Sequence, residues 1–223
     1  MMNPLNQIDQ LFLKATQNNL ALSYIDEVKV LCKTFEGMED FAELDMKCKR
    51  VMSTIYSLRG QYEKAFALDL QILPNMPVTH QHYWGLMYSA TTNSTPLGRM
   101  DEVRPYVVAY LKEGVFNFGS KLMILKWYVS QYPSGENGTF DEFESIVSAI
   151  TKTLEVGIDA SLSFSERVLF LDRANHDENS RTNDLHVAMR DAKPEDKQLI
   201  LNEYLAGKPL KWYRDYALKI FAK

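Results

Sequence analysis

A short pattern built on glycine recurs three times and constrains the fold of this chain more than any other feature. Each copy has a glycine, an apolar residue two positions later, an acidic residue directly after it and another apolar residue five positions after the glycine; the position between the last two is acidic in the second and third copies and Lys64 in the first. The copies begin at Gly60, Gly98 and Gly138, which are 38 and 40 residues apart. Glycine permits a tight turn, and acidic residues favour the first turn of a helix. Repeats of this period are typical of stacked helix pairs.

The segments around the first copy have helical periodicity. Apolar side chains recur every three or four residues from Phe41 to Leu58, which places them on one face of a helix. A second such segment, residues 61–73, ends at Pro74 and Pro77, so the turn at Gly60 is expected to join two antiparallel helices. Further helices are expected at residues 4–18, 20–36, 163–174, 183–191, 194–206 and 209–222. Since no segment alternates like a strand, we predict an all-α fold.

The first of these helix pairs resembles a tetratricopeptide repeat (TPR). Tyr56, Gly60, Tyr62 and Ala65 stand where that family places its tyrosine, its Gly-x-Tyr and its alanine, and Ser53 stands at its small helix-crossing position. The later copies depart from the family, with larger residues in place of the alanine and longer turns at residues 92–97 and 133–137. The resemblance implies stacked antiparallel helix hairpins in a TPR-like superhelix. We expect one domain over residues 1–223, with a repeat-like core at 39–157 and a C-terminal helical cap at 163–223.

The same resemblance implies that the chain binds a protein or peptide in a groove and has no chemistry of its own. Aromatic residues are concentrated in the middle of the chain, and aromatics with a polar tip are favoured at interfaces. One version of this hypothesis is a regulator or inhibitor that masks its partner, in which residues 1–207, with a charge of −4 − 4 = −8, cover a basic surface. Arg50 and Thr54 replace the lysine and asparagine of the clamp with which the family binds acidic peptide ends, and this departure argues against such a clamp. The candidate partner-binding residues are Arg50, Tyr83, Trp84, Tyr88 and Lys126.

Histidines supply the main alternative, a hydrolase or metal-dependent enzyme using His80, His82, His176 and His186. On a helix, His80 and His82 would diverge by about 200°, so they could share a metal only in an extended segment. The polar residues 176–181 match neither a calcium loop nor a zinc motif and are predicted to form a solvated loop. No nucleophile elbow or phosphate loop is present. We therefore expect no enzyme activity, no cofactor and no metal.

The C-terminal segment, residues 208–223, carries five basic residues against one acidic residue in an amphipathic helical pattern. Such a helix could bind an anionic membrane or nucleic acid, but a repeat array also needs a terminal cap, which we favour. The net charge of −4 is too mild to predict a nucleic-acid partner. Cys32 and Cys48 have apolar neighbours and suit reduced core thiols. With no leader pattern and no apolar run long enough to span a membrane, we expect a cytoplasmic location.

Overall fold

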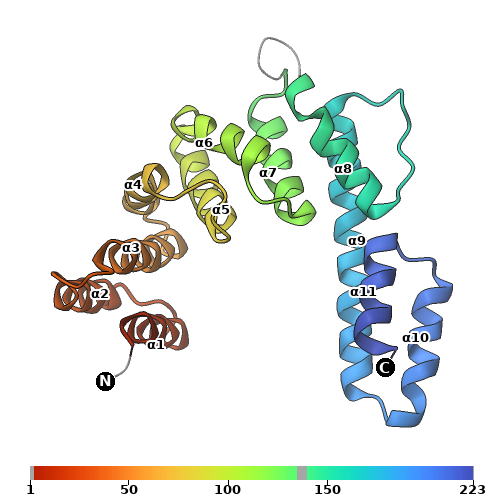
Figure 1. Ribbon diagram of the computed structural model, residues 1–223, viewed down its shortest axis with the longest axis horizontal. Helices are drawn as coiled ribbons and strands as arrows, with labels where there is room; N and C mark the ends of the chain where they lie inside the picture. Colours follow the sequence, from red (N-terminus) through yellow and green to blue (C-terminus); the bar gives the residue numbers. More distant parts are fainter. Residues whose placement is uncertain (1–2, 135–139, 223) are drawn as a thin grey trace. The chain divides into compact units, whose positions relative to one another are not determined.

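All the regular secondary structure in the described part of the chain is helical. The computed structural model describes residues 3–134 and 140–222, and none of these residues forms a strand (Figure 1). The all-α prediction is therefore confirmed. Contacts within the chain divide it into two compact units, residues 1–115 and 116–223. This division falls within the repeat-like core that was expected at residues 39–157, and each unit is described below by itself.

The first unit is a succession of helices in which each helix packs on the next. Contacts join α1 to α2, α2 to α3, α3 to α4, α4 to α5 and α5 to α6, and α3 also touches α1 and α5. The helices are α1 (Pro4–Gln17), α2 (Ser23–Thr34), α3 (Phe41–Leu58), α4 (Tyr62–Ile72), α5 (Tyr83–Ser94) and α6 (Met100–Glu113), with the 3-10 turns η1 (Leu73–Asn75) and η2 (Thr95–Leu97).

Two of the three recurring glycines occupy the left-handed turns that the pattern predicts. Gly60 has a φ of +69° between α3 and α4, and Gly98 has a φ of +66° between η2 and α6, a conformation that costs glycine little because it has no β-carbon. Gly138 lies outside the described residues. The long turn expected at residues 92–97 is wrong, because α5 continues to Ser94 and η2 follows it, so the chain reverses only at Gly98.

One apolar cluster in the core of the first unit is built from the periodic apolar positions of α1, α2 and α3, and further buried apolar residues come from α4, α5 and α6. Ser53 and Ala65, at the two small positions of the TPR-like pattern, are buried where α3 crosses α4. The Ser53 hydroxyl approaches the Ala65 carbonyl at 3.3 Å, so small side chains bring the two helices close together. The core residues contributed by α1 to α3 are Ile8, Ala15, Ile25, Val28, Leu44, Cys48, Val51, Met52 and Ile55, with Phe35 just after α2.

The second unit is arranged around one long helix, α9 (Phe164–Asp191). This helix contacts α7 (Phe118–Gln131), α8 (Glu144–Leu154), α10 (Lys197–Ala206) and α11 (Lys211–Phe221). Two 3-10 turns, η3 (Asp141–Phe143) and η4 (Pro194–Asp196), precede α8 and α10. Figure 1 shows α9, α10 and α11 side by side in the blue part of the chain.

The prediction of a solvated loop at residues 176–181 is wrong, because α9 runs through them without a break. Ser163 caps the N-terminus of the helix: its hydroxyl accepts from the Glu166 amide, while the Glu166 carboxylate accepts from the Ser163 amide. The polar segment contains no glycine or proline that could end a helix. Buried or half-buried positions recur at alternating intervals of three and four residues through it: Val168, Leu171, Asn175, Glu178, Thr182, Leu185 and Met189.

Three of these positions, Asn175, Glu178 and Thr182, are polar and form what we call the polar seam. The Tyr213 hydroxyl of α11 donates to Asn175 Oδ1 at 2.7 Å, and the Tyr204 hydroxyl of α10 lies 2.9 Å from Thr182 Oγ1. Glu178 is paired with Arg181 of the same helix. Asn175 and Thr182, which flank the segment that was expected to be solvated, thus help to hold α11 and α10 against α9.

Candidate functional site

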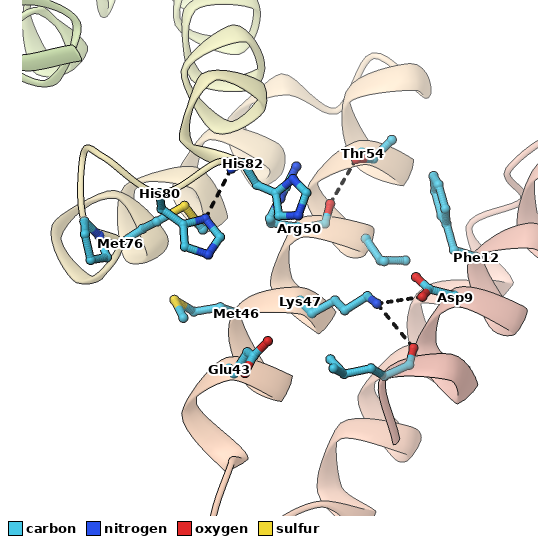
Figure 2. A pocket seen from close by; sticks show the side chains of 13 residues that line it. Asp9, Phe12, Glu43, Met46, Lys47, Arg50, Thr54, Met76, His80 and His82 are labelled. Carbon is cyan, nitrogen blue, oxygen red and sulfur yellow. Dashed lines mark hydrogen bonds and ion pairs between the residues drawn. The ribbon is translucent and has the colours of Figure 1, made fainter. Parts of the chain in front are cut away.

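A groove in the first unit lies between α1, α3 and the segment that connects η1 to α5. Its volume is about 580 Å³, and its walls combine apolar side chains with both kinds of charge (Figure 2). Helix α1 contributes Leu5, Asp9 and Phe12; α3 contributes Glu43, Met46, Lys47, Arg50, Val51 and Thr54; and the connecting segment contributes Met76, Pro77, His80 and His82.

The lysine of this groove is already engaged. Lys47 Nζ donates to Asp9 Oδ2 at 2.8 Å and to the Leu5 carbonyl at 3.3 Å, contacts that join α3 to α1 (Figure 2). The positive charge of Lys47 is therefore offset by the carboxylate of Asp9. This pair shapes one wall of the groove and leaves little net charge there.

Arg50 differs from Lys47, because its guanidinium has no hydrogen-bond or ion-pair partner among residues 3–134 and 140–222. It lies one turn after Met46 on α3 and is half-buried. Burial lowers the pKa of Arg50, and attraction to Asp69 opposes that shift in part. Since a guanidinium carries five N–H donors, Arg50 brings unused donors and a partly desolvated charge to the groove.

Asp69 is the nearby carboxylate, but it does not pair with the Arg50 guanidinium, because its oxygens accept hydrogen bonds from other side chains. It is buried on α4, where it accepts from the Ser53 hydroxyl at 2.7 Å, the Ser89 hydroxyl at 3.0 Å and the Asn93 amide at 2.8 Å. Burial raises the pKa of Asp69, while these three hydrogen bonds and the nearby Arg50 lower it. This network joins α3, α4 and α5 behind the groove and places a negative charge near the arginine without hydrogen bonding to it.

Gly85 of α5 makes room for the arginine. A β-carbon built on Gly85 would stand 3.2 Å from one Arg50 guanidinium nitrogen, so the side chain lies against bare backbone. Trp84 and Tyr88 lie beside Gly85 on α5 and are separated by one helical turn. Their side chains are 42 % and 49 % exposed, respectively. Both side chains are therefore accessible from solvent, and their role as partner-binding residues stays a prediction.

Tyr83 occupies a different environment from its neighbour and cannot contact a partner in this structure. It is only 2 % exposed, its ring stacks on Tyr110 with centroids 6.0 Å apart, and burial raises its pKa to about 12. Successive residues of a helix point about 100° apart, and on α5 this difference places Tyr83 in the core and leaves Trp84 exposed. The choice of Tyr83 as a partner-binding residue is corrected to a core residue.

Lys126, the remaining predicted residue, belongs to the second unit. It lies on α7, where Nζ forms an ion pair with Asp172 Oδ2 of α9 at 2.6 Å. Lys126 is not among the residues that line the groove of the first unit. The geometry of that groove is therefore complete without it.

The four histidines do not form one site. His80 and His82 precede α5, with ring centroids 5.5 Å apart, and the His82 backbone amide donates to His80 Nδ1 at 3.2 Å. His176 and His186 are ten residues apart on the continuous helix α9, which separates them by about 15 Å. Within the described residues, no three histidine, cysteine, aspartate or glutamate side chains are grouped so that they could hold a metal ion.

The basic C-terminal helix, α11, packs through one face and offers a mixed surface on the other. Tyr213 and Ala217 are buried, whereas Trp212 is partly exposed and stacks on Tyr216. Lys211 and Arg214 lie 3.7 and 4.0 Å from the Glu155 carboxylate, which offsets part of their charge. None of the helices in the described residues is long and apolar enough to cross a membrane.

The chain matches no protein-family model, no curated protein and no solved structure. The resemblance of residues 45–74 to a tetratricopeptide repeat therefore rests on the residues named above.

Proposed function

We propose that this chain is a non-enzymatic interaction module of TPR-like helix pairs, and that the groove of its first unit holds an acidic segment of another protein. The observation that supports the proposal is the half-buried guanidinium of Arg50 at the wall of that groove, which has no hydrogen-bond or ion-pair partner among the described residues. A partner whose acidic segment is held there would be masked from other contacts, which is how a regulator or inhibitor acts.

A carboxylate is the group that complements Arg50 best. The guanidinium fork can donate two parallel hydrogen bonds to the two oxygens of one carboxylate. Because Arg50 is already half-buried, part of the cost of removing its water has been met during folding. A hydrogen bond to a charged group contributes about 1.5–3 kcal/mol, enough to anchor a segment.

The apolar side chains around Arg50 add a second requirement for the ligand. Met46, Val51 and Met76 line the groove, and methionine adapts its shape to different apolar partners. Trp84 and Tyr88 are exposed on α5, the helix that carries Gly85, and partly exposed aromatic residues are common anchors of protein interfaces. We therefore expect a ligand in which an acidic residue is flanked by apolar residues.

A random peptide library displayed on phage tests the proposal. Selection on the full chain should enrich peptides with acidic residues next to apolar ones, and their affinity can be measured by fluorescence anisotropy. Arg50→Met keeps the length and much of the apolar stem of the side chain but removes the charge, and it should weaken binding about 10- to 100-fold. Raising the salt concentration should also weaken binding to the unaltered chain.

Lys126→Met is the matched control, because it removes a cation from the second unit and should leave the affinity unchanged. Circular dichroism establishes that both variants are folded. Enriched peptides that lack acidic residues, or that bind Arg50→Met as tightly as the unaltered chain, would contradict the proposal.

A further inference from the structure

A second concave surface lies on the outer side of the first helix pair. It is a trough of about 720 Å³ between α1 and α2, with Leu11, Val30 and Leu31 at its apolar centre. The side chain of Val30 is 65 % exposed, one of the most exposed large apolar residues in the described chain. An apolar surface of this kind is typical of an interface.

This trough and the Arg50 groove lie on opposite faces of α1. Leu5, Asp9 and Phe12 point into the groove, whereas Gln10, Leu11 and Lys14 line the trough. At about 100° per residue, the two sets are separated by roughly half a turn around the helix axis. A molecule bound in the trough therefore leaves the groove open.

Opposite charges stand on the two sides of the trough. Lys14 lies on α1 and Glu27 on α2, and neither side chain has an ion-pair or hydrogen-bond partner in the part of the chain that the structure describes. Asp26, also on α2, is paired with Lys29 at 3.3 Å. The trough thus carries one free cation on one side of its apolar centre and one free anion on the other.

We propose that the occupant of this trough is a second copy of the same chain, related by a two-fold axis. In such a dimer each surface contacts its own copy, so a charge on one side of the axis meets the charge on the other side. Lys14 of each copy then faces Glu27 of the other copy, and this contact occurs twice. The Val30 side chains fill the apolar centre between them.

The position of α1 and α2 in the first unit supports the same occupant. Among the described residues, α1 and α2 make their main helix contacts with each other and with α3, and the face that carries the trough is left uncovered. The uncovered face carries the apolar centre and the two free charges described above. A second copy of this face supplies an apolar surface of matching extent and the complementary charges. This inference does not depend on the proposed function of the groove.

Sedimentation velocity of the full chain over a range of concentrations tests the dimer. We expect a dimer that dissociates on dilution. Lys14→Glu and Glu27→Lys should each raise the dissociation constant at least about tenfold, because each change turns two attractions into two repulsions. The double variant, which exchanges the two charges, should restore the dimer, as should an equimolar mixture of the two single variants.

Val30→Asp should abolish the dimer, and Leu58→Asp is its matched control, since Leu58 is equally exposed on α3 but lies outside the trough. Circular dichroism of each variant separates loss of association from loss of folding. A monomer at all concentrations, a dimer that survives Val30→Asp, or a double variant that remains as weak as the single variants would each overturn the proposal.

Discussion

The guanidinium of Arg50 lies over the backbone at Gly85, with one nitrogen 3.2 Å from the place where a β-carbon on residue 85 would stand. The two residues belong to α3 and α5, so the position of the arginine at the groove depends on the absence of a side chain on a neighbouring helix. A side chain added at residue 85 should therefore have two different effects, one on the stability of α5 and one on the position of the Arg50 guanidinium.

Gly85→Ala should therefore make the protein more stable and the groove a weaker binder. Alanine favours a helix interior over glycine by about 0.8–1 kcal/mol, and the atom it crowds is the end of a flexible side chain that can move. We expect the free energy of unfolding in urea to rise by up to about 1 kcal/mol. Peptides selected on the unaltered chain should bind the variant less tightly, because the guanidinium is displaced. A fall in stability would show that Arg50 cannot move aside.

Arg50→Met should raise the pKa of Asp69. Burial already raises this pKa, and attraction to Arg50 is one of the effects that oppose the rise, so removing the charge leaves burial less opposed. The ¹³C chemical shift of the Asp69 carboxyl group, followed against pH by NMR, measures the change. Arg50→Lys keeps the charge and should leave the pKa nearer its original value. An unchanged pKa in Arg50→Met would mean that the two charges do not interact.

Tyr83 should make the protein less stable at alkaline pH. Burial raises the pKa of folded Tyr83 to about 12, whereas an unfolded tyrosine has a pKa of about 10. Between pH 10 and pH 12 Tyr83 loses its proton in the unfolded chain but keeps it in the folded chain, which favours unfolding. The contribution of Tyr83 to the free energy of unfolding is therefore fully present below pH 10 and is lost as the pH rises towards 12. The free energy of unfolding of Tyr83→Phe should therefore fall less steeply over this range. Parallel urea titrations at several pH values provide the comparison.

Proline in the middle of α9 should strongly destabilise the second unit. Asn179 is exposed and lies within the polar segment, so Asn179→Pro removes no buried side chain but interrupts the helix, at a cost of about 3 kcal/mol or more. Asn179→Ala is the control and should be neutral or slightly stabilising. Thermal unfolding followed by circular dichroism measures both variants. If Asn179→Pro unfolded like the unaltered chain, this segment would behave as a loop.

Lys126→Ala should change stability little. Lys126 and Asp172 form a well-made ion pair, but the lysine side chain is about half exposed, and surface pairs of this kind contribute about 0–1 kcal/mol. We expect a difference in unfolding free energy within this range, and it should shrink as salt is added. A larger loss would assign Lys126 a structural role between α7 and α9.

Local signals explain what the sequence could predict. Helices α1 to α4 lie where the sequence predicted helices, and the turns at Gly60 and Gly98 follow from glycine itself. Arg50 could be chosen because it lies on α3 at a position that the TPR resemblance assigns to ligand contact. The burial of Asp69 could also have been predicted, because it lies within an otherwise apolar stripe of α4. A buried carboxylate is expected to have hydrogen-bond partners, as Asp69 has in Ser53 and Asn93.

The errors arose where the local signal was ambiguous or the contact was distant. Tyr83 and Trp84 are both aromatic, so the pattern could not decide which of them faces the core. The polar seam of α9 resembles a solvated surface unless the tyrosines of α10 and α11 are known to meet it. The groove itself needs Asp9 beside Lys47, a contact between residues 38 positions apart that leaves no trace in local periodicity.

The polar seam also has a consequence for how α10 and α11 align with α9. Two helices joined only by apolar side chains can slide by one turn, about 5.4 Å, and still bury similar surfaces. Such a shift would move the Tyr213 hydroxyl away from Asn175 and the Tyr204 hydroxyl away from Thr182, leaving buried polar groups without partners. The hydrogen bonds of the polar seam therefore favour one register of α10 and α11 along α9 over registers shifted by one helical turn.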